Sequence, residues 1–156
     1  RSLIDEEWYI QAMSELSKWE NTGEDDLVGF LKLKAYFIQA IEWIVLVDPS
    51  TEYMWQKWEV GGELEWQDAI DICKHWTGAG FNDWKLPDKS KLESMFGGSS
   101  LLRDKFPDIK ENSCIWTSTS PSYGSSHAWN MNFFNRTMFK QYKSNLCNVR
   151  CVRGNF

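Results

Sequence analysis

The sequence predicts an α+β fold, because helical patterns come early in the chain and short strand patterns come late. In the first part of the chain, apolar residues recur with the period of an amphipathic helix, whereas in the last third they alternate with polar residues, as in a half-buried strand. The length of 156 residues and the hydrophobic fraction of 42% suffice for one domain with a buried core and an appended segment.

An N-terminal helical segment is expected over residues 1–46. Its first helix covers residues 3–19, with one face formed by Ile4, Trp8, Ala12, Leu16 and Trp19. The polar stretch NTGEDD ends this helix. A second helix follows, and the residues on or near its apolar face are Leu27, Phe30, Leu31, Lys34, Phe37, Ile38 and Ile41. The two helices are expected to pair as a hairpin that supports the rest of the chain or joins copies of it.

Two strands and a helix are expected next. WIVLVD is the continuous apolar run of a buried strand, and PSTEYMWQKW is a turn that leads into a second strand. The helix after them has an apolar face that consists of Trp66, Ala69, Ile70, Cys73 and Trp76. Gly78 or Gly80 is suited to end it.

A short helix and several strands complete the chain. Pro87 requires an extended chain before it, and Asp88 or Ser90 can cap a helix that carries Leu92, Met95 and Phe96. CIWTSTS is strand-like and PSYGSS is turn-like. HAWNMNF alternates, so one side holds Trp129, Met131 and Phe133 and the other holds Ala128, Asn130 and Asn132. The final strand has Val149 and Cys151 on one face, opposite Arg150 and Val152.

Composition argues against several classes of function. The net charge of −5, without a stripe of Lys or Arg, does not favour nucleic acid as a partner. The longest apolar stretch is interrupted by Lys32, Lys34 and Glu42, so no membrane span is expected. The cysteine spacing and the two histidines predict neither a metal site nor a cofactor. No set of nucleophile, base and orienting group is visible, so the chain is not expected to be an enzyme.

The motifs YMWQKW, WQDAIDIC, GFNDWKLPD, IWTSTS, AWNMNF and VRCVRG occur in this order between about Val47 and Gly154. This series resembles the Lcl C-terminal domain family. The resemblance implies a C-type lectin fold over residues 47–156, which is a twisted mixed sheet with two flanking helices and long loops. The structural turn of the family then falls on Asp83, Trp84, Leu86 and Pro87.

The resemblance also implies roles for single residues. Trp116 and Trp129 become core anchors, and Arg150 and Arg153 belong to the closing strand. In this family a helix cysteine often lies near the cysteine of the last strand, which implies either a disulfide or two buried thiols at Cys73 and Cys151. Cys114 and Cys147 depart from the pattern, so their pairing stays open. Lys85 stands where the family has Arg, and the helical N-terminal segment is not part of the common pattern.

The ending also resembles variable proteins of diversity-generating retroelements, in which mutagenesis at adenines rewrites chosen codons. An Asn codon of the AAC type can become many residues, but not Lys, Gln, Glu, Met or Trp. Between residues 122 and 148, the following residues lie inside the reachable set: Tyr123, Gly124, Ser125, Ser126, His127, Asn130, Asn132, Phe134, Asn135, Arg136, Thr137, Phe139, Tyr142, Ser144, Asn145, Leu146, Cys147 and Asn148. The unreachable residues are Trp129, Met131, Met138, Lys140, Gln141 and Lys143.

We therefore expect a variable protein that binds a protein or glycan ligand on a foreign or host surface through a diversified C-terminal face. The expected ligand-binding residues are Tyr123, Ser125, Ser126, His127, Asn130, Asn132, Phe134, Asn135, Arg136, Thr137, Phe139, Tyr142, Ser144, Asn145, Leu146 and Asn148. Aromatic anchors with small polar groups are typical of paratopes. A place on a cell surface or viral particle is implied by the resemblance alone. The alternative is a non-diversified adhesion or structural module, in which the Asn-rich strand is a solvated sheet face.

Overall fold

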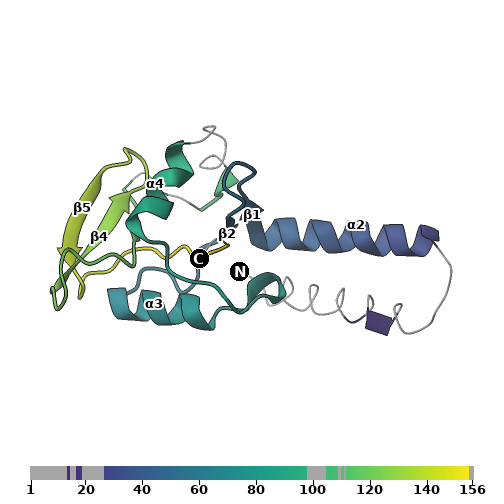
Figure 1. Ribbon diagram of the computed structural model, residues 1–156, viewed down its shortest axis with the longest axis horizontal. Helices are drawn as coiled ribbons and strands as arrows, with labels where there is room; N and C mark the ends of the chain where they lie inside the picture. The colour runs from purple at the N-terminus through teal and green to yellow at the C-terminus, as the bar shows by residue number, and fades with distance from the viewer. Residues whose placement is uncertain are drawn as a thin grey trace. The chain divides into compact units, whose positions relative to one another are not determined.

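The computed structural model describes residues 27–97, 105–108, 110 and 112–154, together with Ser14, Ser17 and Lys18. The chain divides into two compact units, Arg1–Ile44 and Val45–Phe156, and each is described by itself. Figure 1 gives the element labels that are used below. The helix expected over residues 3–19, and with it the helical hairpin, lies almost entirely outside the described residues.

Helix α2, Leu27–Ile44, is the described helix of the first unit. It extends farther than the sequence predicts: the apolar run WIVLVD predicts a strand from Trp43, but Trp43 and Ile44 are helical. No glycine or proline lies between Gly29 and Pro49, so nothing in this stretch stops the helix before the β-branched Val45. Among the described residues, no helix combines the length and the apolar character that a membrane crossing requires.

The first sheet of the second unit has the strand order β1–β2–β6, and both pairings are antiparallel. Its strands are β1 Val45–Val47, β2 Met54–Gln56 and β6 Val152–Arg153. The closing strand is shorter than expected, and residues 149–152 are all buried, whichever face they occupy. Both sides of this segment are covered, and the Cys151 N–H donates to the Gln56 side-chain oxygen at 2.9 Å.

Two helices flank the sheets. Helix α3, Trp66–His75, buries Ala69 and Cys73. It ends before the glycines that were expected to stop it, because Trp76 already has an extended backbone, and the glycines form the short turn η1, Gly78–Gly80. Helix α4, Lys89–Gly97, is capped by Asp88, whose Oδ1 accepts the Lys91 N–H at 2.7 Å.

The second sheet is an antiparallel meander with the strand order β3–β4–β5. Its strands are β3 Cys114–Trp116, β4 His127–Asn132 and β5 Met138–Tyr142. A hydrophobic core joins this sheet to α4 and to β1, β2 and β6, and its buried members are Leu46, Trp55, Leu92, Met95, Phe106, Ile115, Met131, Phe133 and Val152. The observed mixture of helices and small antiparallel sheets is of the α+β class.

Two disulfides tie the second unit together. Cys73 of α3 is bonded to Cys151, which is the pair implied by the family resemblance. Cys114 of β3 is bonded to Cys147, whose pairing the sequence left open. The second bond fixes the segment that follows β5 against β3.

Candidate functional site

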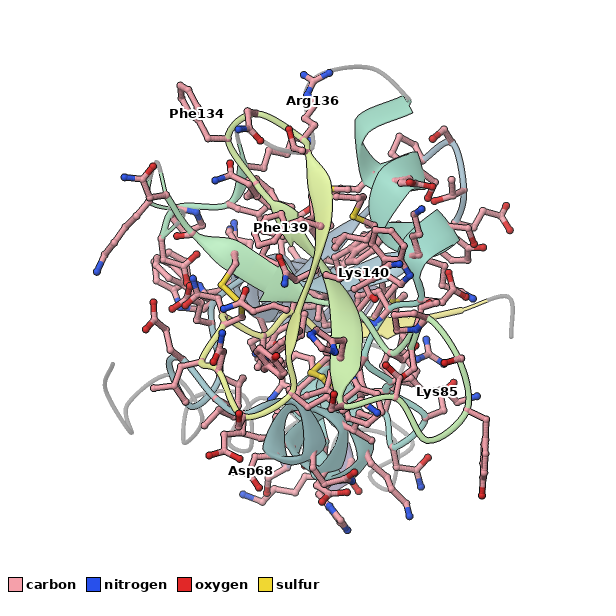
Figure 2. The ribbon with its side chains drawn as sticks, turned by 90° about the vertical axis from the view of Figure 1, so that its left-hand side faces the viewer. Asp68, Lys85, Phe134, Arg136, Phe139 and Lys140 are labelled. Atoms are coloured by element: carbon pink, nitrogen blue, oxygen red, sulfur yellow. A yellow bond between two sulfur atoms is a disulfide. The ribbon has the colours of Figure 1, made fainter. Side chains whose placement is uncertain are left out.

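Most of the reachable residues lie on one surface of the second unit, formed by the β4–β5 hairpin and the loops beside it. We call this the hairpin surface, and it comprises the loop 121–126, the turn 133–137, strand β5 and the loop 143–146. Figure 1 shows β5 at the outer edge of its sheet, beyond β4. Figure 2 views the unit from this side, with Phe139 and Lys140 on β5 and with Phe134 and Arg136 at the turn.

The loop 121–126 presents Tyr123 at its tip. The side chain of Tyr123 is fully exposed, at 108% of its reference area, and Gly124 next to it has a positive φ of 73°. The loop is held from within, because the Ser125 N–H donates to the Ser122 carbonyl and the Ser125 hydroxyl accepts the His127 N–H, both at 3.1 Å. Tyr123 is therefore an aromatic side chain on an ordered turn.

The turn between β4 and β5 is built by two asparagines. Asn132 Oδ1 accepts the N–H groups of Phe134 and Asn135 at 3.0 and 3.1 Å, and Asn135 Oδ1 accepts the Thr137 N–H at 3.0 Å. Such side-chain bonds to nearby backbone replace the bonds that a turn leaves open. Phe134 and Arg136 extend from this turn into solvent (Figure 2).

One face of the hairpin carries aromatic rings and cations. The register sets His127 opposite Tyr142 and Trp129 opposite Lys140. The His127 and Tyr142 rings lie 4.1 Å apart between centroids. The Nζ atoms of Lys89 and Lys140 lie 4.3 and 5.1 Å from the centre of the Trp129 ring. Trp129 is half-buried and lies beside two lysines, so it is not the core anchor that the resemblance implies. Trp116 is fully buried, as the resemblance implies.

Two of the expected ligand-binding residues lie in the interior instead. Asn130 is fully buried and its amide nitrogen donates to Gln141 Oε1 at 3.0 Å. Asn148 is 6% exposed and its backbone bonds to Cys114 and Trp116. The alternation in HAWNMNF placed Asn130 correctly relative to its neighbours, but the chain covers both faces of the sheet at this point. Neither side chain is available to a ligand on the hairpin surface.

The loop after β5 is fixed at both ends. The Lys143 N–H donates to Ser126, and the Lys143 carbonyl accepts the Trp66 N–H, both at 2.9 Å. The Lys143 Nζ lies 3.8 Å from the centre of the Trp66 ring. The disulfide at Cys147 holds the other end. Between these anchors, Ser144, Asn145 and Leu146 are exposed.

The charge of the hairpin surface differs in sign from that of the whole chain. All 22 acidic residues lie at or before Glu111, whereas residues 112–156 carry five basic residues: Arg136, Lys140, Lys143, Arg150 and Arg153. Arg150 pairs with Asp108, and Arg153 pairs with Asp83 at 2.6 Å. The basic groups of the hairpin surface are the other three. The net charge alone did not reveal this local surplus, although the acid-free ending of the sequence contains the signal.

The two arginine pairs are structural. Arg150 is fully buried, donates to the carbonyls of Gln56 and Lys57, and packs over the Phe106 ring. Hydrogen bonds from Arg153 lower the pKa of Asp83. Burial raises the pKa of Glu59, and the neighbouring Asp108 carboxylate adds to this effect. These groups join the first sheet to the loops beside it and do not lie on the hairpin surface.

The geometry can be set beside known proteins. The Lcl C-terminal domain family matches residues 44–153. Seven chains of known structure match this one. Among them is the crystal structure of botrocetin, with a TM-score of 0.49 and 10% sequence identity over 72% of this chain and 97% of that chain. No curated protein matches.

Proposed function

The chain belongs to the Lcl C-terminal domain family through residues 44–153, and on this premise we propose that it is a ligand-binding protein whose hairpin surface is diversified by a retroelement. The second unit would act as a non-catalytic module of the C-type lectin type. It would recognise a protein or glycan surface by non-covalent contacts.

The observation that carries this proposal is an agreement between two properties of each residue: whether mutagenesis of an AAC codon can produce it, and whether its side chain is exposed. Most of the reachable residues have exposed side chains: Tyr123, Ser126, Phe134, Asn135, Arg136, Thr137, Phe139, Tyr142, Ser144, Asn145 and Leu146. Of the six unreachable residues, five are buried or half-buried: Trp129, Met131, Met138, Gln141 and Lys143. The sixth, Lys140, is exposed but lies beside the Trp129 ring. Substitution would therefore change the surface and spare the packing.

The exposed set also has the chemistry of an adaptable binding surface. Phe134, Phe139 and Tyr142 are 49%, 36% and 57% exposed, which leaves large rigid side chains facing solvent. Rigid aromatic side chains supply contact area at low entropic cost, and short amide and hydroxyl side chains between them supply hydrogen bonds. These groups stand on a hairpin that the Cys114–Cys147 disulfide and several backbone bonds hold in place.

Five reachable residues are expected to be constant for structural reasons. Ala128, Asn130, Phe133 and Asn148 are buried, and Cys147 is bonded to Cys114, which lies outside the reachable region. A change at Cys147 would leave Cys114 without its partner. The proposal therefore assigns diversification to the exposed positions alone.

The second candidate function is a fixed adhesion or structural module of the same fold. It is favoured by the structural roles of the asparagines, because Asn132 and Asn135 form the hairpin turn and Asn130 and Asn148 are buried. Their abundance therefore has an explanation without diversification. The large exposed areas of Tyr123, Phe134 and Tyr142 favour the diversified interpretation over this one.

Two displayed libraries of the full chain test the proposal. The first randomises six exposed reachable positions: Phe134, Thr137, Phe139, Tyr142, Ser144 and Asn145. The second randomises the six unreachable positions. We expect most members of the first library to stay folded and to yield binders to unrelated proteins, and most members of the second to unfold. A first library that is mostly unfolded, or that yields no binder, would overturn the proposal.

The neighbouring phenylalanines give a matched control for stability. Phe133 is fully buried, whereas Phe134 is 49% exposed. Phe133→Ala should lower the free energy of unfolding by about 3–5 kcal/mol, and Phe134→Ala should change it by less than about 0.5 kcal/mol. Urea unfolding measures both. Similar losses for the two variants would mean that Phe134 is part of the core and not available to a ligand.

A further inference from the structure

We infer that the free edge of β5 accepts an extended acidic peptide of the ligand as an additional β-strand. The inference rests on the proposed function in one respect, that the hairpin surface is where the ligand binds. It goes further in naming the chemistry of the ligand and the backbone groups that hold it.

Strand β5 is the last strand of its sheet in the part of the chain that the structure describes. The backbone of Thr137 and Lys143 bonds to Asn132 and Ser126, which fixes the residues of this segment that face β4. Alternate residues of an antiparallel strand bond to the same neighbour. Met138, Lys140 and Tyr142 therefore direct their N–H and C=O groups away from β4. Among the described residues, one of these groups has a local partner: the Tyr142 carbonyl accepts the Asn145 N–H at 2.9 Å.

The N–H and C=O groups that point away from β4 suit a peptide strand better than an anionic sugar. Donors and acceptors alternate along the strand at the spacing of another peptide backbone, which is the basis of recognition by strand addition. An oligosaccharide has no repeating pair of donor and acceptor at this spacing. The strand also contains no proline, so no donor is missing along β5.

The charges beside the edge favour an acidic peptide. Residues 112–154 contain no acidic residue, and no ion pair joins Lys140 or Lys143 to a carboxylate among the described residues. The two ammonium groups lie against the Trp129 and Trp66 rings, which hold them beside the strand. The lysines are three positions apart in the chain, so a peptide with two acidic residues three positions apart can meet both.

The same charges oppose a second copy of this chain as the occupant. Edge-to-edge pairing of two β5 strands would bring the Lys140 and Lys143 side chains of both copies together. Lysines on exposed edges are a common protection against such pairing. A complementary acidic strand removes this repulsion, and an identical strand does not.

Binding of a peptide as an additional strand is compatible with a surface whose side chains differ between variants. Backbone hydrogen bonds are the same whatever residue occupies positions 139 and 142, and Lys140 and Lys143 are outside the reach of adenine mutagenesis. The edge would give every variant the same basal affinity for an acidic strand. The diversified side chains on both sides of the edge would then set specificity.

The test uses the full chain and a short peptide of threonine and valine with two glutamates three positions apart. Three further peptides serve as controls: one N-methylated at the amides that would face β5, one with lysine in place of glutamate, and one with the same residues scrambled. Binding is measured by titration, and the changed residues are located by amide chemical shifts. We expect N-methylation to weaken binding by ~10-fold or more, because at least two backbone bonds are lost, and the lysine peptide not to bind.

Two substitutions at one position separate charge from backbone. Lys140→Ala removes the charge and should weaken binding ~2–5-fold. Lys140→Pro removes the charge and the outward N–H, and should abolish binding while the protein stays folded, because proline is tolerated on an edge strand whose N–H faces solvent. Lys74→Ala, in the last turn of α3, is the control and should leave binding unchanged. Thermal unfolding of each variant shows that it is folded.

Several outcomes would overturn the inference. Equal binding of the N-methylated peptide or of Lys140→Pro would exclude a backbone role. Tighter binding of an acidic oligosaccharide at the same lysines would assign the site to a glycan, and a concentration-dependent dimer through β5 would assign it to a second copy. If the peptides fail but the first library yields binders, this inference fails and the proposed function stands. If the peptide binds as expected but the library yields none, the edge site stands without diversification.

Discussion

Arg136 occupies a backbone conformation that arginine rarely adopts. Its φ is 62°, in the left-handed region, at the end of the β4–β5 turn. A side chain with a Cβ is crowded in this region, and asparagine tolerates it better because its short amide bonds locally. Asparagine is also the residue whose codon the proposed mutagenesis would rewrite. An original asparagine at position 136 would explain why arginine stands at this site.

We predict that Arg136→Asn raises the free energy of unfolding by about 0.5 kcal/mol, because it relieves part of this strain. Chemical denaturation of the two proteins measures the difference. Arg136→Ala is the control, since it removes the long side chain but keeps the conformational cost. An equal gain for alanine and asparagine would show that the arginine side chain, and not the backbone, is the source of the cost.

The Asp83–Arg153 pair makes stability depend on pH. Hydrogen bonds from Arg153 hold the pKa of Asp83 below its ordinary value. A carboxyl group with a lowered pKa in the folded state stabilises that state above its unfolded pKa, and the contribution is lost as the pH falls through the folded pKa. Asp83 is nearly half exposed, so solvent limits the contribution to less than about 1 kcal/mol.

Asp83→Asn should therefore lower the free energy of unfolding at pH 7 and have a progressively smaller effect toward acidic pH. Urea unfolding measured across the acid range gives the profile. Glu63→Gln is a control on an exposed carboxyl group. A loss for Asp83→Asn that stays constant at every pH would contradict the ion pair as the cause.

At the scale of single elements, the two disulfides hold different parts of the second unit. Cys73–Cys151 joins α3 to the chain that leads into β6, over a separation of 78 residues. Cys114–Cys147 joins β3 to the loop after β5, over 33 residues. Each closes a long loop, and the entropy of the unfolded chain predicts a stabilisation of roughly 4 kcal/mol from each bond.

We predict that the double variant Cys114→Ser and Cys147→Ser loses up to about 4 kcal/mol, with the largest increase in amide hydrogen exchange at residues 143–148. Helix α3 should keep its protection, because the other disulfide remains. Hydrogen exchange followed by residue measures both regions. Equal increases in α3 and in the loop would show that the two disulfides do not act on separate elements.

Some elements could be predicted from the sequence and others could not. The periodicity of residues 66–76 predicted α3, because that helix has one buried face. The alternation in HAWNMNF predicted β4, although both faces of this strand are covered. Strand β5 was not predicted, because none of its residues is fully buried and its pattern therefore carries no alternation. The boundary between α2 and β1 was misplaced by the continuous apolar run WIVLV, which has no period to distinguish helix from strand.

At the scale of the molecule, the proposed function depends on a division between a constant scaffold and a changeable surface. The scaffold consists of the shared core, the two arginine pairs and the two disulfides. The surface consists of one hairpin and its loops, where a charge of opposite sign to that of the whole chain is concentrated. A scaffold fixed at this many points is expected to tolerate substitutions on the surface with little loss of stability.

The candidate site was predicted from the sequence in outline but not in detail. The richness in aromatic and small polar residues located it near residues 122–148, and most of those side chains are exposed. The buried positions Asn130 and Asn148 could not be separated from the exposed ones, because an asparagine looks the same in a turn, in the interior or on a binding surface. The role that we propose for Lys140 and Lys143 depends on the edge position of β5, which only the structure supplies.

The most direct test of the central claim is to sequence the 3′ end of this gene across the population that carries it. The account predicts substitutions at the exposed reachable positions between residues 123 and 146, where a template copy has adenine. It predicts constancy at the six unreachable positions and at Ala128, Asn130, Phe133, Cys147 and Asn148. An invariant 3′ end, or substitutions as frequent at the buried positions as at the exposed ones, would contradict diversification and leave the hairpin surface as one fixed surface.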